Sequence, residues 1–168
     1  MKRIAAIFLT VLTVTASLCS CIEKEPRPCL DVLSAMTESE IDLPAGKIYS
    51  SIAEKGSDKY LPESLTSALF GNGSAPSLSS DWLDCALFLS LNEHPCEFAV
   101  IYCRNRDTAL DTAKLLNSRI DAVKIQKGNE FPDILNQARV TVIGNYAVMA
   151  ISTDSESAVS KAKNAIIE

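Results

Sequence analysis

The stretch "DCALFLSLNEHPCEFAVIYC", residues 84–103, predicts the centre of the fold. Its two apolar runs, 84–91 and 97–103, are rich in residue types that favour strands, and the five residues between them suit a hairpin loop. Both runs are apolar on both faces, so we expect an antiparallel hairpin in the middle of a sheet.

Apolar spacing outside this hairpin predicts the remaining elements. Further strands are expected at 46–53, 139–143 and 146–151, the last two joined by a Gly144-Asn145 turn. Helices are expected at 29–36, 61–71, 107–124, 131–138 and from a capping box at 153–156 to about 167. Asp107 and Thr153 are the expected N-caps of the two longest helices.

The order of elements from residue 84 onward is strand, strand, helix, short helix, strand, strand, helix. Two such hairpin-helix units predict an α+β fold: one antiparallel sheet of about four to five strands, with helices packed mainly on one face. The chain has 168 residues. This length suits a single domain, which we place at residues 29–168.

The first 20 residues have the layout of a secretory signal. Lys2 and Arg3 precede an apolar run, which is followed by the smaller residues Thr15, Ala16 and Ser17. The run is shorter than the roughly 20 residues that span a bilayer, so a retained transmembrane helix is the weaker alternative.

Cys21 is the expected lipidation site. Leu18 stands three residues before Cys21 and the small Ser20 stands next to it, as in bacterial lipoprotein signals; the bulky Leu18 next to Cys19 does not fit. A diacylglycerol on Cys21 would anchor the chain to the outer face of the cell membrane. Residues 21–28 would then be the lipidated N-terminus and a short tether. An ordinary secreted protein cut nearby is the other possibility.

The charge balance is acidic. Loss of Lys2 and Arg3 with the signal would take the net charge from −5 to −7. Such a domain has no electrostatic footprint for nucleic acid, and its partner is expected to be an unknown envelope protein or ligand. Arg104 and Arg106 follow the second central strand; we expect them to be solvated, with an anion contact as the alternative.

Cys85 and Cys103 lie in the two central strands. If Leu91 pairs with Glu97, these cysteines lie opposite each other, where Cβ atoms are about 4.5–5.5 Å apart and close to bridging distance. The sequence therefore permits a Cys85–Cys103 disulfide, with two buried thiols as the alternative.

The loop between the central strands contains His94, the only histidine, and Cys96. These residues are the one place for histidine-dependent nucleophilic chemistry. In an extended segment their side chains would be about 6.5 Å apart, too far for a direct hydrogen bond. Adjacent loop residues rarely supply the three or four ligands of a zinc site. We therefore assign no catalytic residue, metal or cofactor.

Four stretches resemble the domain of unknown function 4358, a family found in lipoproteins of clostridial-type bacteria. They lie between residues 46 and 152 and read "GKIYSSIAEKGSDKYLPESLTSALFG", "DWLDCALFLS", "HPCEFAVIYCRNRDTALDTAKLLNSRID" and "IGNYAVMAIS". The resemblance covers about two thirds of the expected mature domain. It implies a lipid-anchored extracytoplasmic domain and brings no activity to any residue.

The sequence therefore predicts a membrane-anchored extracytoplasmic lipoprotein that serves as a binding or accessory module of the cell envelope. The alternative is a hydrolase or metal-dependent enzyme that uses the His94–Cys96 loop.

Overall fold

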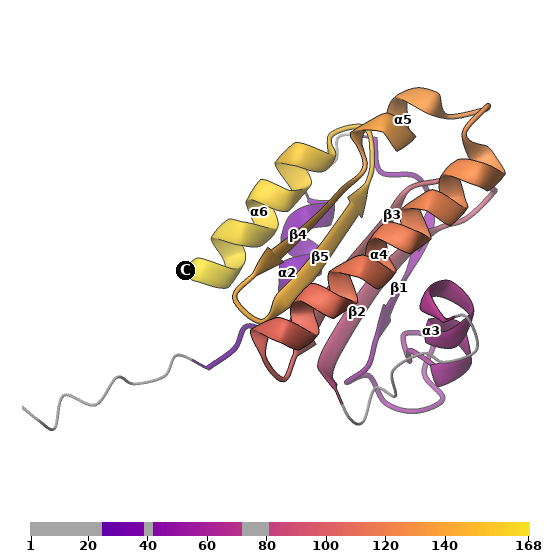
Figure 1. Ribbon diagram of the computed structural model, residues 1–168. Helices are drawn as coiled ribbons and strands as arrows, with labels where there is room; N and C mark the ends of the chain where they lie inside the picture. The colour runs from indigo at the N-terminus through magenta and orange to yellow at the C-terminus, as the bar shows by residue number, and fades with distance from the viewer. Residues whose placement is uncertain (1–24, 39–41, 72–80) are drawn as a thin grey trace, which may run out of the picture.

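The computed structural model describes residues 25–38, 42–71 and 81–168 (Figure 1). The expected signal peptide at 1–20 and the expected lipidation site Cys21 lie outside these residues. No helix in the described part of the chain is both long and apolar enough to span a membrane.

A five-stranded antiparallel sheet in the order β1-β2-β3-β5-β4 forms the middle of the molecule. Its strands are β1 (Gly46–Ser50), β2 (Trp82–Ser90), β3 (Glu97–Cys103), β4 (Arg139–Ile143) and β5 (Tyr146–Ile151). The predicted central hairpin is confirmed, because β3 is the middle strand and β2 lies beside it. Gly144 and Asn145 form the turn between β4 and β5, and Gly144 has a left-handed φ of 58°, which glycine adopts without steric cost.

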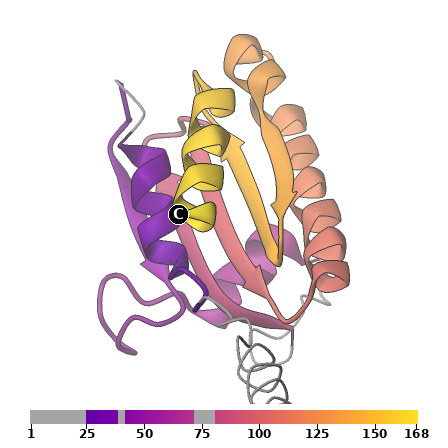
Figure 2. The same cartoon turned by 90° about the vertical axis from the view of Figure 1, so that its left-hand side faces the viewer.

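The helices cover both faces of this sheet (Figures 1 and 2). They are α2 (Cys29–Thr37), α3 (Glu63–Phe70), α4 (Arg106–Lys127), α5 (Pro132–Gln137) and α6 (Ser155–Ile167). Residues of α3, α4 and α5 pack in one apolar cluster, and residues of α2 and α6 pack in a second cluster on the opposite face. The α+β class and the antiparallel sheet are as expected.

The expectation that helices lie mainly on one face is wrong. Along β2, Cys85 and Leu87 enter the α4 cluster, whereas Ala86 and Phe88 enter the α2–α6 cluster. A strand with apolar side chains on both faces needs a helical layer on each side to exclude water. The sheet is therefore the middle of three layers.

Two helix N-caps differ from the expected ones. The N-cap of α4 is Asn105, whose side chain accepts a hydrogen bond from the Thr108 N–H, and Asp107 lies in the first turn. The N-cap of α6 is Asp154, one residue beyond Thr153, and its side chain accepts from the Ser157 N–H. Side chains of either kind can satisfy the first N–H groups of a helix, so sequence alone does not choose between neighbouring candidates.

Candidate functional site

The pairing of β2 with β3 moves the two central cysteines apart. Leu89, not Leu91, lies opposite Glu97, so Cys85 faces Ile101 and Cys103 faces Trp82. The register that would set Cys85 opposite Cys103 therefore differs by two residues from the one that forms. Its cause lies in the loop, where Asn92 and Glu93 have left-handed φ values of 58° and 64°, and the turn begins before Leu91 can pair.

Cys85 and Cys103 are buried thiols in the same apolar cluster. As diagonal neighbours on one face, they have backbones about 7–8 Å apart rather than directly opposed. Burial raises the pKa of the Cys85 thiol well above its usual value, and it also raises that of Cys103. Neither side chain is an accessible thiolate.

The hydroxyl of Thr112 joins Cys103 to Trp82. The Trp82 indole N–H donates to Thr112 Oγ1 at 2.9 Å, and Cys103 Sγ lies 3.5 Å from the same oxygen. Trp82 is 2% exposed, which makes it a core residue.

His94 and Cys96 do not form a nucleophilic pair. Nδ1 of His94 accepts a 3.1 Å hydrogen bond from the backbone N–H of Cys96, and the His94 ring packs against Phe131 with 5.3 Å between ring centroids. The Cys96 side chain is 1% exposed and belongs to the α2–α6 cluster, whereas Phe131 packs against the α4 cluster. The imidazole supports the turn, and the thiol is part of the core.

Metal ligation requires several donor side chains around one point. Within residues 25–38, 42–71 and 81–168, no group of three or more histidine, cysteine, aspartate or glutamate side chains is placed to hold an ion.

Asp84 connects three separate parts of the fold. One carboxylate oxygen accepts the backbone N–H of Cys29, the first residue of α2, at 2.7 Å. The other oxygen accepts the Ser51 hydroxyl at 2.9 Å and the Cys85 N–H at 2.7 Å. Burial, followed by the negative charge of Asp84, raises the pKa of the Cys29 thiol well above its usual value. Asp84 therefore fixes the start of α2 to the sheet.

A cavity of about 600 Å³ lies where the chain enters the domain, and we call it the tether-base cavity. Its walls are the segment 25–27, the β4–β5 turn, the end of β3 with Tyr102 and Arg104, and Ile166 near the end of α6. Four regions far apart in sequence therefore converge at this end of the sheet.

The segment 25–27 is fixed to the wall of this cavity. The Tyr146 hydroxyl donates to the backbone carbonyl of Arg27 at 2.8 Å, and the Tyr102 and Tyr146 rings pack with centroids 4.7 Å apart. Burial raises the pKa of Tyr146 well above its usual value, so the phenol stays protonated and remains a donor. The backbone N–H of Arg104 donates to the backbone carbonyl of Asp81 at 3.1 Å. This hydrogen bond holds the chain at the end of β3, where the Arg104 side chain begins.

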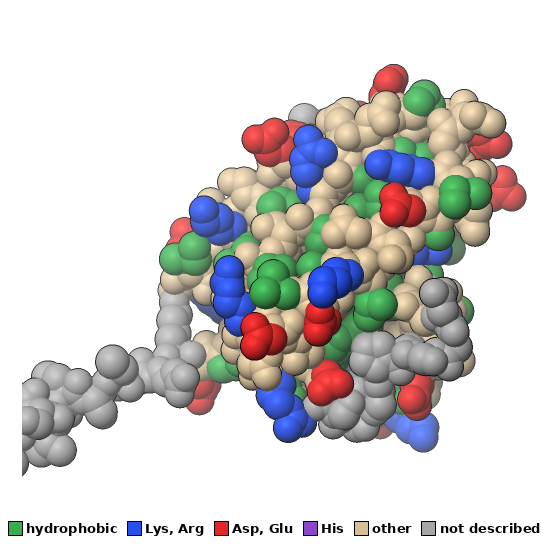
Figure 3. Space-filling model, in the orientation of Figure 1, with side chains coloured by type: hydrophobic (Ala, Val, Ile, Leu, Met, Phe, Trp, Pro, Cys, Tyr) green, Lys and Arg blue, Asp and Glu red, His purple; other side chains and the backbone are tan. Residues whose placement is uncertain are grey.

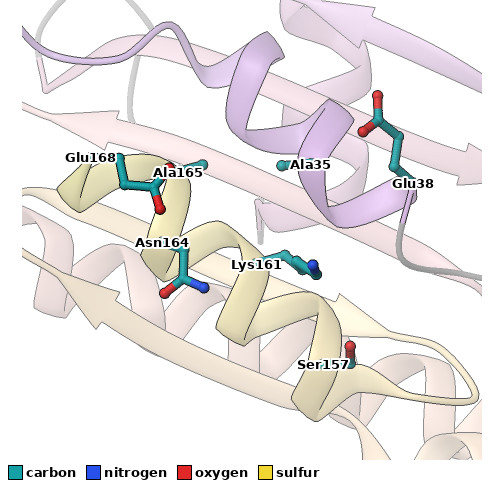
Figure 4. A pocket seen from close by; sticks show the side chains of 7 residues that line it. All are labelled: Ala35, Glu38, Ser157, Lys161, Asn164, Ala165 and Glu168. Carbon is teal, nitrogen blue, oxygen red and sulfur yellow. The ribbon is translucent and has the colours of Figure 1, made fainter.

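A second hollow of about 570 Å³ lies between α2 and α6 (Figure 4). Lys161 reaches from α6 toward α2, whereas Glu38 points away from α6. The polar side chains that line this hollow do not converge on a point, and Ala35 and Ala165 supply part of its wall. This hollow is therefore a weaker candidate for a binding site than the tether-base cavity.

No protein-family model, no curated protein and no solved structure matches this chain. The resemblance to the domain of unknown function 4358 stays a prediction.

Sequence reasoning placed Arg104 at a strand end and gave an anion contact only as an alternative. It did not bring this arginine to the same cavity as Arg27, because 77 positions separate the two in the chain. The paired Tyr102 and Tyr146 were also missed, since each was counted only as part of an apolar strand.

Proposed function

We propose that this protein is a lipoprotein anchored to the outer face of the cell membrane through Cys21, and that its folded domain is a binding or accessory module of the envelope. The observation that carries the proposal is the signal-like segment ending at Cys21, directly before a domain whose first residues are fixed to the sheet. The partner of the module is an envelope protein or ligand.

The fixed entry of the chain supports one orientation of the domain. Glu25 is four positions after Cys21, and a fully extended chain spans at most about 3.6 Å per residue. Glu25 would therefore lie within about 14 Å of the lipidated sulfur. The end of the sheet that carries the β4–β5 turn would face the membrane, and the β2–β3 loop would face away from it.

A binding role fits this geometry better than catalysis. The alternative enzyme needs a reactive group in the His94–Cys96 loop, but the Cys96 side chain is buried and the His94 ring nitrogen Nδ1 is engaged with the backbone. No observation favours a role for this loop beyond supporting the hairpin.

The test compares Cys21→Ala with Cys19→Ala in cells. We expect Cys21→Ala to leave the membrane fraction for the precursor form or the medium, and Cys19→Ala to fractionate as the parent does. Intact mass of the membrane form should show a diacylglycerol on Cys21. Normal acylation of the Cys21→Ala protein would contradict the anchor.

Crosslinking in intact cells, followed by mass spectrometry of the captured neighbours, tests the binding role. We expect a reproducible neighbour that crosslinks to surface residues of the folded domain. Capture that is equally strong with an unrelated lipoprotein of similar abundance would contradict a specific module.

A further inference from the structure

We propose that the tether-base cavity binds the phosphate group of an anionic phospholipid in the leaflet that carries the anchor. The inference rests on the proposed function, because it assumes that Cys21 brings this end of the domain to the membrane. It adds a second, non-covalent contact and names its ligand.

The first support is position. The cavity wall includes residues 25–27, so the cavity begins only four residues after the expected lipid attachment. A covalent anchor at that distance holds phospholipid headgroups near the cavity at a high effective concentration. A weak site would therefore be occupied.

The second support is chemistry. Arg27 and Arg104 approach the same cavity from different segments, and the planar guanidinium group binds phosphate through parallel N–H donors. Glu25 also lines the cavity, and the negative charge of Asp84 acts on Tyr146 in its wall, so recognition rests on the geometry of the guanidinium donors and not on an excess of positive charge. Tyr102 and Ile166, both partly exposed, supply the amphipathic and apolar surface that suits the boundary between headgroups and acyl chains.

The third support is that the site is held in place. Tyr146 fixes the Arg27 backbone by its hydrogen bond, and the hydrogen bond from the backbone N–H of Arg104 to the Asp81 carbonyl fixes the backbone on the other side of the cavity. The cavity volume, about 600 Å³, lies within the usual range of about 300–1,000 Å³ for small-molecule sites.

The fourth support is the charge distribution on the face seen in Figure 3. Lysine, arginine and acidic side chains are interspersed over the face seen in Figure 3, without an extended basic patch. The expected mature chain, with a net charge of −7, would be repelled by an anionic leaflet as a whole. A local pair of arginines at the tether allows this acidic domain to contact such a leaflet in one orientation.

The experiment uses the full-length protein, expressed with its own signal and purified in detergent. Native mass spectrometry counts the phospholipid retained from an equimolar mixture of phosphatidylglycerol and phosphatidylcholine. We expect preferential retention of phosphatidylglycerol, with about a tenfold loss of retention in the Arg27→Gln/Arg104→Gln double variant. Each single variant should show a smaller loss, which keeps the test informative if the double variant is poorly folded.

Arg106→Gln and Arg139→Gln are the matched controls, because both arginines are exposed and neither lines the cavity. Retention should stay within about twofold of the parent in both, since exposed charges away from a site contribute little. Equal retention of the two lipids, or unchanged retention in all the cavity variants, would overturn the proposal.

Inorganic phosphate, added at increasing concentration, distinguishes a lipid headgroup from a soluble anion. As free phosphate is added, phosphatidylglycerol should remain bound at concentrations at which the free phosphate itself does not fill the cavity. Binding of phosphate alone, lost in the double variant and without lipid retention, would overturn the lipid assignment. The covalent mass on Cys21 is read in the same spectrum, so failure of the anchor and failure of the cavity site are separate results.

Discussion

Asp84 accepts a 2.7 Å hydrogen bond from the backbone N–H of Cys29, although 55 positions separate the two residues. The contact joins the start of α2 to the central sheet directly after residues 25–28. It also places a negative charge at a helix N-terminus, where the helix dipole favours an anion.

Replacement of Asp84 should therefore destabilise the domain. Asp84→Ala leaves the Cys29 N–H, the Cys85 N–H and the Ser51 hydroxyl without this acceptor, and we expect a loss of about 2–3 kcal/mol in the free energy of unfolding. Asp84→Asn retains one acceptor oxygen and should lose less. Urea unfolding followed by the fluorescence of Trp82 measures both.

Asp111→Ala is the control for this series. Asp111 pairs with Lys114 at 2.7 Å, but its side chain is 74% exposed, so the expected change is within about 0.5 kcal/mol. Equal stability of Asp84→Ala and Asp111→Ala would show that the Asp84 contacts do not hold α2 to the sheet.

The ion pair between Glu97 and Arg119 should behave as a buried pair. The two side chains are only 11% and 16% exposed, and the guanidinium donates from Nε at 2.9 Å and from Nη2 at 2.5 Å. Arg119→Leu leaves a largely buried carboxylate unpaired and should cost about 2–4 kcal/mol. Arg119→Leu/Glu97→Leu should cost less than Arg119→Leu alone, because it removes both charges.

A double-mutant cycle by chemical denaturation measures this coupling. Arg119→Lys should recover only part of the loss, since an ammonium group cannot reproduce the two parallel hydrogen bonds. Additive effects of the Arg119 and Glu97 single variants would contradict a coupled pair.

His94 should make a small pH-dependent contribution to stability. Burial, and then the charge of Lys127, lowers the pKa of His94 from 6.5, so the folded domain binds fewer protons than the unfolded chain in the window just below pH 6.5. Stability should rise with pH through that window and level off above 6.5. His94→Gln should remove this part of the slope.

NMR titration of the imidazole reports the same effect directly. Lys127→Met should raise the His94 pKa by removing the positive charge, while the shift caused by burial remains. A His94 pKa above 6.5 in the parent protein would contradict this assignment.

Cys85 and Cys103 should both be alkylated in unfolded protein that has not been reduced. The structure holds both as thiols at 0% exposure, and burial raises the pKa of each. Labelling of the folded protein should therefore be much slower than labelling after unfolding. Peptide mapping with and without reductant tests this prediction. Labels that appear on the two cysteines only after reduction would show that the register of β2 and β3 allows a Cys85–Cys103 disulfide.

Much of the fold could be predicted because it depends on local patterns. The alternation in 139–151 predicts that Val140, Met149 and Ile151 share one face, and the structure packs all three against the same cluster. The helical spacing of Leu116, Ile120 and Val123 likewise marks the buried side of α4. Such periods are set by backbone geometry and need no knowledge of distant residues.

The register of the central hairpin could not be predicted in the same way. A shift of two residues keeps every side chain on its own face, so the apolar pattern fits either pairing. The left-handed residues Asn92 and Glu93 decided the outcome by turning the chain early, which placed Ile101 opposite Cys85.

The sequence by itself determined an apolar antiparallel sheet, its helices and the candidate anchor at Cys21, because periodicity and segment order are properties of neighbouring residues. Only the tertiary structure decided which helices cover each face, that Asp84 holds the start of α2, and that Arg27 and Arg104 share a cavity. These relationships join residues that are distant in the chain. They depend on how the layers stack to bury both faces of the sheet, which no local pattern specifies.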